Sequence, residues 1–91
     1  MSVTVRIPTQ LRTLTGGAGE VMVDGDTVGA SLKALEVAHP GFAERLFDEG
    51  GQLRRFVNVF VDDEDVRFLG GLETPLVDGQ TVSVVPAVAG G

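Results

Sequence analysis

The chain has 91 residues, of which 43% are hydrophobic and 22% charged, a composition that indicates one small folded domain and excludes a disordered chain. It has no cysteine and one histidine, which excludes disulfides, a cysteine nucleophile and a zinc site, so we expect no bound metal. The formal net charge of −6 disfavours nucleic acid as a partner. We find neither a signal peptide nor an apolar run of about 20 residues, so we expect no membrane partner and a cytoplasmic location.

The first predicted element is a β-strand over residues 3–7. Apolar and polar side chains alternate there with period two, which is typical of a strand buried on one face, and Arg6 falls on the outer face. Pro8 ends this strand, and a glycine-rich turn over residues 15–19 separates it from a second short strand over residues 20–23. Together the two strands predict a hairpin.

A helix is predicted over residues 28–38, because apolar residues recur there at positions i, i+4 and i+7. These residues are Val28, Leu32 and Leu35. Asp26 or Thr27 is expected to cap its first turn, since either side-chain oxygen can accept a bond from an unpaired backbone N–H group. The Pro40-Gly41 pair ends the helix, and a short helical turn over residues 42–47 is expected to close one end of the core.

A third strand is predicted over residues 55–61, where three valines share one face and Phe60 falls on the other, outward face. Residues 62–65 are all acidic and predict a solvated turn, because they lack the ligand spacing and the glycine of a calcium loop. A short strand is expected near residues 66–68.

The last strand is predicted over residues 81–85, after a turn at Asp78-Gly79, and Pro86 closes it. Alternation along this strand places Val84 in the core and Val85 on the outward face. An outward valine near an outward phenylalanine predicts an apolar patch, which on small proteins often marks a partner site.

This order of elements favours an α+β fold, the ubiquitin-like β-grasp, in which a mixed, mostly antiparallel sheet of four to five strands packs on one main helix. We expect residues 1–86 to form the domain and residues 87–91 to leave it as an extended, flexible tail with a reach of about 16 Å. The core is expected to bury the apolar face of the helix against Val3, Val5, Val57, Val59, Val82 and Val84.

The tail, Ala87 to Gly91, is the most informative segment. Glycine has no Cβ, so Gly90 and Gly91 make a thread thin enough to enter a narrow crevice of another protein. The α-carboxylate of Gly91 is a group that another enzyme can activate, whereas the rest of the chain carries no catalytic constellation. We therefore expect the chain to be no enzyme and to be acted on by one.

With this tail and this order of strands, the chain resembles the MoaD/ThiS family of ubiquitin-like sulfur carrier proteins over residues 3–91. Within that family it is most similar to carriers of the CysO type. The resemblance lies in residues 56–59, 62–68, 74–79 and 87–91.

The resemblance implies a chemistry performed by partner enzymes. An adenylating enzyme of the ubiquitin-activating type uses ATP, with Mg, to convert the Gly91 carboxylate to an acyl-adenylate, and a sulfur donor then replaces AMP to leave a thiocarboxylate. A sulfur-accepting synthase uses that group to make cysteine or another sulfur metabolite, and a metalloprotease-type hydrolase regenerates the carrier. The carrier itself binds no cofactor.

The resemblance also implies which residues meet the partners. Val88, Ala89 and Gly90 would thread into a partner's active site. Partners of the family bind the sheet face near the tail, so Phe60 and Val85, together with Val88, are expected to form the docking patch. Arg6 projects from the same face and is expected to pair with an acidic residue of a partner.

Two other functions remain open from the sequence. A protein modifier joined to lysines of other proteins would need the same tail and the same activation. A plain β-grasp binding domain with an inert C-terminus would need neither.

Overall fold

The computed structural model describes residues 2–55 and 57–86. Its strands are β1 (Ser2–Arg6), β2 (Glu20–Asp24), β3 (Val57–Val61), β4 (Glu64–Asp65) and β5 (Thr81–Pro86). Its α-helices are α1 (Val28–Ala38) and α2 (Phe42–Leu46). Three short 3-10 helices complete the structure: η1 (Thr9–Thr15), η2 (Val66–Phe68) and η3 (Gly71–Glu73).

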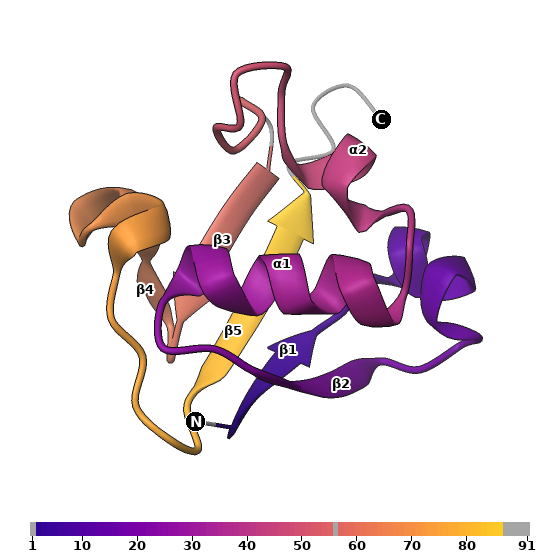
Figure 1. Cartoon of the computed structure of the whole chain (residues 1–91), viewed down its shortest axis with the longest axis horizontal. Helices are drawn as coiled ribbons and strands as arrows, with labels where there is room; N and C mark the ends of the chain where they lie inside the picture. Colours follow the sequence, from indigo (N-terminus) through magenta and orange to yellow (C-terminus); the bar gives the residue numbers. More distant parts are fainter. Residues whose placement is uncertain (1, 56, 87–91) are drawn as a thin grey trace.

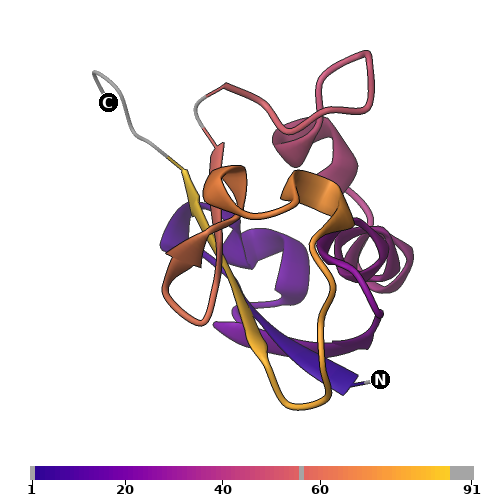
Figure 2. The ribbon, with the colours of Figure 1, turned by 90° about the vertical axis from the view of Figure 1, so that its left-hand side faces the viewer.

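The five strands form one sheet in the order β2-β1-β5-β3-β4, with α1 lying across one face (Figure 1). Only the β1–β5 pair is parallel, and the β1–β2, β3–β5 and β3–β4 pairs are antiparallel. Seen from the side, α1 and α2 form one layer and the sheet forms the other (Figure 2). The predicted α+β fold, a ubiquitin-like β-grasp with a mixed, mostly antiparallel sheet, is confirmed.

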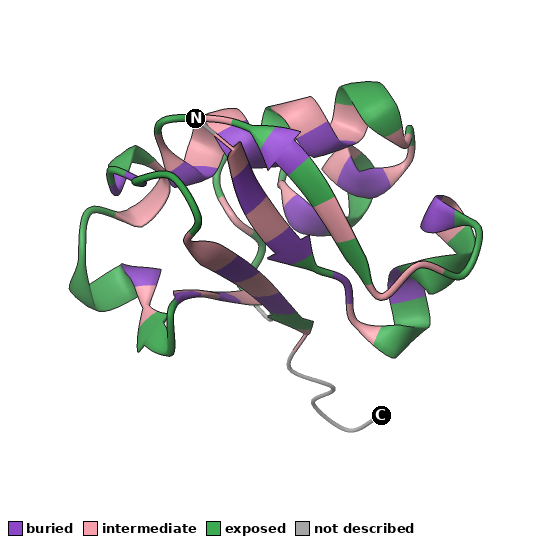
Figure 3. Cartoon of the chain, turned by 90° about the horizontal axis from the view of Figure 1, so that it is seen from below, coloured by how far each residue is buried: buried purple, intermediate pink, exposed green. Residues whose placement is uncertain are grey.

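The core lies between α1 and the sheet, and it contains every residue predicted to be there. Burial alternates along the strands (Figure 3), so β1, β3 and β5 each present one apolar face to the helix. Val28, Leu32 and Leu35 of α1 are fully buried against this face. Burial of apolar surface, at roughly 25 cal/mol per Å², is the main stabilising term of such a core.

Helix α1 begins and ends close to the predicted positions. Thr27 is its N-cap, and the Thr27 side chain accepts a hydrogen bond of 3.1 Å from the backbone N–H of Ala30. The sequence left Asp26 and Thr27 open, and the structure selects Thr27. The helix ends at Ala38, and α2 follows where the short helical turn was predicted, with Phe42 and Leu46 buried.

Glu36 fastens α2 to α1. Its carboxylate Oε1 accepts hydrogen bonds from the backbone N–H groups of Ala43 (2.7 Å) and Gly41 (3.1 Å). These two donors open α2, and a charged acceptor contributes more than a neutral one because the bonds are charge-assisted.

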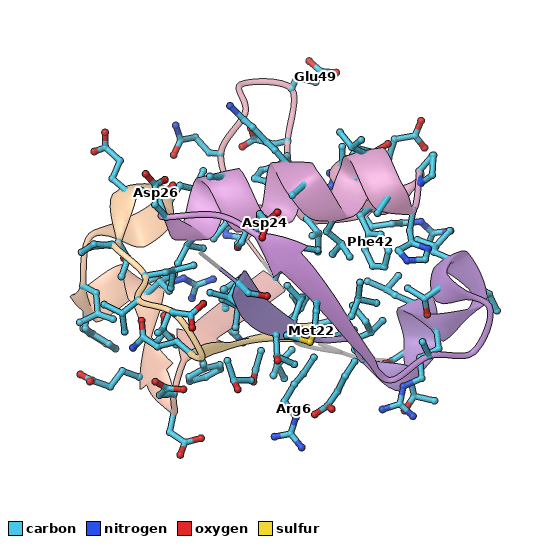
Figure 4. All side chains as sticks on the ribbon, turned by 60° about the horizontal axis from the view of Figure 1, so that its bottom comes forward. Arg6, Met22, Asp24, Asp26, Phe42 and Glu49 are labelled. Atoms are coloured by element: carbon cyan, nitrogen blue, oxygen red, sulfur yellow. The ribbon has the colours of Figure 1, made fainter. Side chains whose placement is uncertain are left out.

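Replacing Glu36 by alanine is therefore expected to lower the free energy of unfolding by about 1–3 kcal/mol, since two half-buried N–H groups lose their acceptor. Urea denaturation monitored by circular dichroism measures this loss. Glu49→Ala is the control, because Glu49 is exposed in a loop (Figure 4) and should change stability by no more than about 0.5 kcal/mol. Equal effects of the two substitutions would contradict the role given to Glu36.

One predicted strand is wrong. Residues 66–68 form the 3-10 helix η2, and the strand that pairs with β3 lies earlier, at Glu64–Asp65, inside the segment predicted to be a turn. The cause is local: the Asp65 carboxylate accepts a bond of 2.9 Å from the backbone N–H of Arg67, which caps η2. Val66 is fully buried in η2, although the predicted strand does not form.

The limits of two other elements differ from the predictions. Strand β3 begins at Val57, and Phe56 lies outside the described residues. Residues 9–15, for which no element was predicted, form η1. Within residues 2–55 and 57–86, no helix is long and apolar enough to cross a membrane, and no three His, Asp or Glu side chains gather where they could hold a metal ion.

Candidate partner-docking face

The face of the sheet that points away from α1 carries the predicted docking residues, and it is called the outer face below. Strand register places Arg6 opposite Ser83 on one side and Phe60 opposite Ser83 on the other. Arg6, Ser83 and Phe60 thus form one row across β1, β5 and β3. Figure 4 shows Arg6 pointing away from the helical layer, whereas Phe42 lies between α1 and the sheet.

The next outward position of β5 is Val85, which lies opposite Asn58 of β3 and is 45% exposed. Phe60 is half-buried. An open hollow of about 440 Å³ brings Arg6, Phe60 and Val85 together. The three side chains that the sequence assigned to docking therefore line one continuous depression.

Sequence reasoning missed several residues that line the same hollow, notably Pro8, Arg12 and Asp63. Asp63 is the second residue of the turn between β3 and β4, so the register of that hairpin would have found it. Arg12 lies in η1, an element that no pattern in the sequence predicts, and its guanidinium Nε donates a 3.1 Å bond to the carbonyl oxygen of Ile7.

Arg6 has an acidic neighbour within the chain. Its Nε atom lies 3.7 Å from Glu20 Oε2, because Arg6 and Glu20 are opposite each other in the β1–β2 register. Both side chains are about two-thirds exposed, at 64% and 63%. An exposed pair of this kind is worth at most about 1 kcal/mol, so a partner's carboxylate can compete with Glu20 for Arg6.

Pro86 is the last described residue, and it lies opposite Val57 at one end of the sheet. It follows Val85 directly, so the end of the described chain lies next to the hollow. Val88, Ala89, Gly90 and Gly91 lie outside the described residues, and their predicted roles stay predictions.

A larger and more apolar groove of about 700 Å³ lies on the helical layer, lined in part by Lys33, Val37 and Phe47. Two of its polar residues have structural tasks: Thr27 caps α1 and Glu36 binds the start of α2.

The comparisons with known proteins agree with the fold. The ThiS family profile matches residues 5–91. The sulfur carrier protein CysO of Mycobacterium tuberculosis strain H37Rv is 55% identical over the whole length of both chains. In the crystal structure of the Amycolatopsis orientalis BexX/CysO complex, a chain with 53% identity superimposes with a TM-score of 0.92, covering 98% of this chain and 99% of that one.

A further relative is the small archaeal modifier protein 3 of Haloferax volcanii, 46% identical over 76% of this chain and 75% of that protein. The family profile and the full-length identity both exceed what a shared fold alone would give. The chain belongs to the ThiS family, that is, to the ThiS/MoaD group of sulfur carrier proteins, which carry sulfur and are not themselves catalysts.

Proposed function

We propose that this sulfur carrier presents the α-carboxylate of Gly91 to an adenylating enzyme of the ubiquitin-activating type. A carboxylate oxygen attacks the α-phosphorus of ATP, held with Mg by that enzyme, and pyrophosphate leaves. A sulfur donor then attacks the acyl carbon, the bond to AMP breaks, and a thiocarboxylate remains at Gly91. Residues 1–86 serve as the recognised body and residues 87–91 as the tail that enters the enzyme.

The observation that carries this proposal is that the similarity runs to the final residue. The family profile ends at Gly91, and the match to CysO spans all of both chains. The Gly90-Gly91 end therefore lies within the matched region, and not in an unrelated extension. Glycines suit this position because a side chain would widen the part that must enter the enzyme.

The outer face is proposed to dock on the partners, with Phe60 and Val85 as its apolar contacts and Arg6 as a charged one. Their position in one hollow beside Pro86 supports this role, since a partner that binds the tail must also cover that surface. For the CysO protein of Amycolatopsis orientalis, a complex with BexX has been crystallised. We infer that this chain forms complexes of similar kind.

The downstream partners are proposed by analogy with the CysO relatives. A sulfur-accepting synthase takes the sulfur to make cysteine or another sulfur metabolite, and a metalloprotease-type hydrolase restores the free carboxylate. We place these steps in the cytoplasm, where ATP is available.

The test is an ATP–pyrophosphate exchange assay with the adenylating enzyme of the same organism. The carrier should be required for exchange of labelled pyrophosphate into ATP, and adding a sulfide donor should yield a terminal thiocarboxylate. A chain lacking Gly90-Gly91 is the control and should support no exchange. Exchange that is absent with the intact chain, or undiminished with the shortened one, would refute the proposal.

Truncation of the docking patch gives a separate prediction. Phe60→Ala is expected to raise the KM of the adenylating enzyme for the carrier by about tenfold, because a central aromatic contact is typically worth more than 1 kcal/mol. Steady-state kinetics measure the change, and the melting temperature reports any loss of folding. Val37→Ala is the control, since Val37 is 84% exposed on α1. A KM that responds equally to both substitutions would rule out the patch.

Protein modification is the second candidate function. It is favoured by the 46% identity to a small archaeal modifier protein. Conjugation would join Gly91 to lysines of other proteins through the same adenylate. Immunoblots of cells expressing a tagged carrier distinguish the two: a ladder of heavier conjugates supports modification, and a single free band supports the carrier alone.

A further inference from the structure

The turn between β3 and β4 holds two consecutive residues in the left-handed region. Asp62 has a φ of 46° and Asp63 a φ of 76°. Two-residue hairpin turns of this shape prefer Asn-Gly or Asp-Gly, because glycine has no Cβ to clash with the backbone. Aspartate tolerates this region better than most residues but less well than glycine.

Hydrogen bonds hold Asp62 in this conformation. One oxygen of its carboxylate accepts a bond of 3.1 Å from the backbone N–H of Thr81, and the other accepts a bond of 3.0 Å from the Gln80 side-chain amide. Its own N–H donates to the Thr81 carbonyl at 3.0 Å. These contacts fix the turn against the start of β5.

Asp63 has no such contacts among the described residues: its exposed side chain makes neither a hydrogen bond nor an ion pair there. Its position is nevertheless specific. It lines the hollow that contains Phe60 and Val85, and also a smaller hollow of about 240 Å³ beside Arg6 and Glu20. Arg6, which lines both hollows, has Glu20 as its ion-pair partner.

We propose that the Asp63 carboxylate is a docking determinant that pairs with a cationic side chain of the adenylating enzyme. This inference rests on the proposed function and adds one residue to its docking face. The apolar patch gives the contact area, and a rim charge beside it selects a partner of opposite sign and speeds encounter. The net charge of −6 acts in the same direction over longer range.

The test compares Asp63→Asn, Asp63→Gly and Glu64→Gln in steady-state adenylation with the enzyme of the same organism. Asparagine removes the charge and tolerates the left-handed region, whereas glycine also removes the strain. Glu64→Gln is the matched control: it removes one charge from the neighbouring residue, but Glu64 lies opposite the buried Val61 and so faces the other side of the sheet.

Both Asp63 variants should raise the KM for the carrier about three- to tenfold at low salt, with kcat unchanged. The difference in KM between each variant and wild type should shrink in 0.5 M salt, because the Debye length falls to about 4 Å and screens the charge. Asp63→Gly should also raise the melting temperature by about 3–6 °C, which shows that the weaker docking does not come from unfolding. Glu64→Gln should leave KM within twofold.

An Asp63 variant that matches wild type in KM overturns this inference alone, because the wild-type chain would still be adenylated. The inference is also overturned if Glu64→Gln raises KM as much as Asp63→Asn does, because the effect would then come from the overall charge and not from Asp63. If the wild-type chain is not adenylated at all, the proposed function fails and this inference falls with it.

Discussion

Gly91→Val is expected to abolish formation of the thiocarboxylate while leaving the domain folded. The substitution places a branched side chain next to the reacting carboxylate, where the partner must enclose the backbone closely. A misplacement of about 1 Å at a reacting centre can cost about 100-fold in rate. We therefore expect adenylation to fall by at least about 100-fold, with Gly91→Ala giving a smaller loss in the same direction.

The measurement is the initial rate of pyrophosphate exchange, made beside a thermal melt of each variant. The control is Gly50→Val, because an added Cβ at Gly50 meets only the Asp48 side chain, at an ordinary contact distance of 3.4 Å. This control should retain full activity. Adenylation of Gly91→Val at the wild-type rate would be incompatible with a tail that threads into a crevice.

Phe42→Ala is expected to give the largest loss of stability in the domain. Phe42 opens α2 and is fully buried in the core, where it closes the end between α1 and the sheet (Figure 4). Removing a buried phenylalanine costs about 3–5 kcal/mol, through lost apolar transfer and the cavity left behind. Domains of this kind have only about 5–15 kcal/mol in total.

Chemical denaturation of Phe42→Ala should therefore show a lowered free energy of unfolding. A thermal melt should show a melting temperature reduced by about 12 °C or more. Phe68→Ala is the matched control, since it removes the same side chain from a site that is 87% exposed. It should change stability by about 0.5 kcal/mol or less. Similar losses for the two variants would show that Phe42 does not close the core.

The parts of the fold that follow from local pattern were predictable. Alternation marked the buried valines of β1, β3 and β5, and the 3.6-residue period marked the apolar face of α1. The start of α1, which the sequence narrowed to a cap at Asp26 or Thr27, depends only on neighbouring residues. The apolar faces predicted for the strands and for the helix are all buried in the same core, and such agreement between local pattern and overall fold is typical of sequences that adopt a single fold.

The parts that depend on distant contacts were not predictable in detail. The acidic residues at 62–65 indicated a turn, but β4 forms there because β3 offers an edge for pairing at Phe60 and Val61. The strand expected at residues 66–68 fails because the Asp65 side chain caps η2. The order of apolar and polar residues along the chain predicts neither the pairing of β4 with β3 nor the capping of η2 by Asp65.

The docking face was half predictable. Parity along the strands placed Phe60 and Val85 outward, but only the register across β1, β5 and β3 brings them into one hollow with Arg6. The pairing of Arg6 with Glu20 depends on the β1–β2 register, and Asp63 lies in the turn between the paired strands β3 and β4. The chemistry of Gly91 came from the resemblance to the family, since no periodicity predicts it.

The most direct measurement is the intact mass of the carrier isolated from its native cells under conditions that keep sulfide adducts. A fraction of the molecules should have one oxygen replaced by sulfur, with fragmentation placing the change at Gly91. That fraction should disappear when the adenylating enzyme is deleted. A carrier whose terminus is a plain carboxylate in every growth condition, with or without that enzyme, would contradict a sulfur-carrying role for this chain.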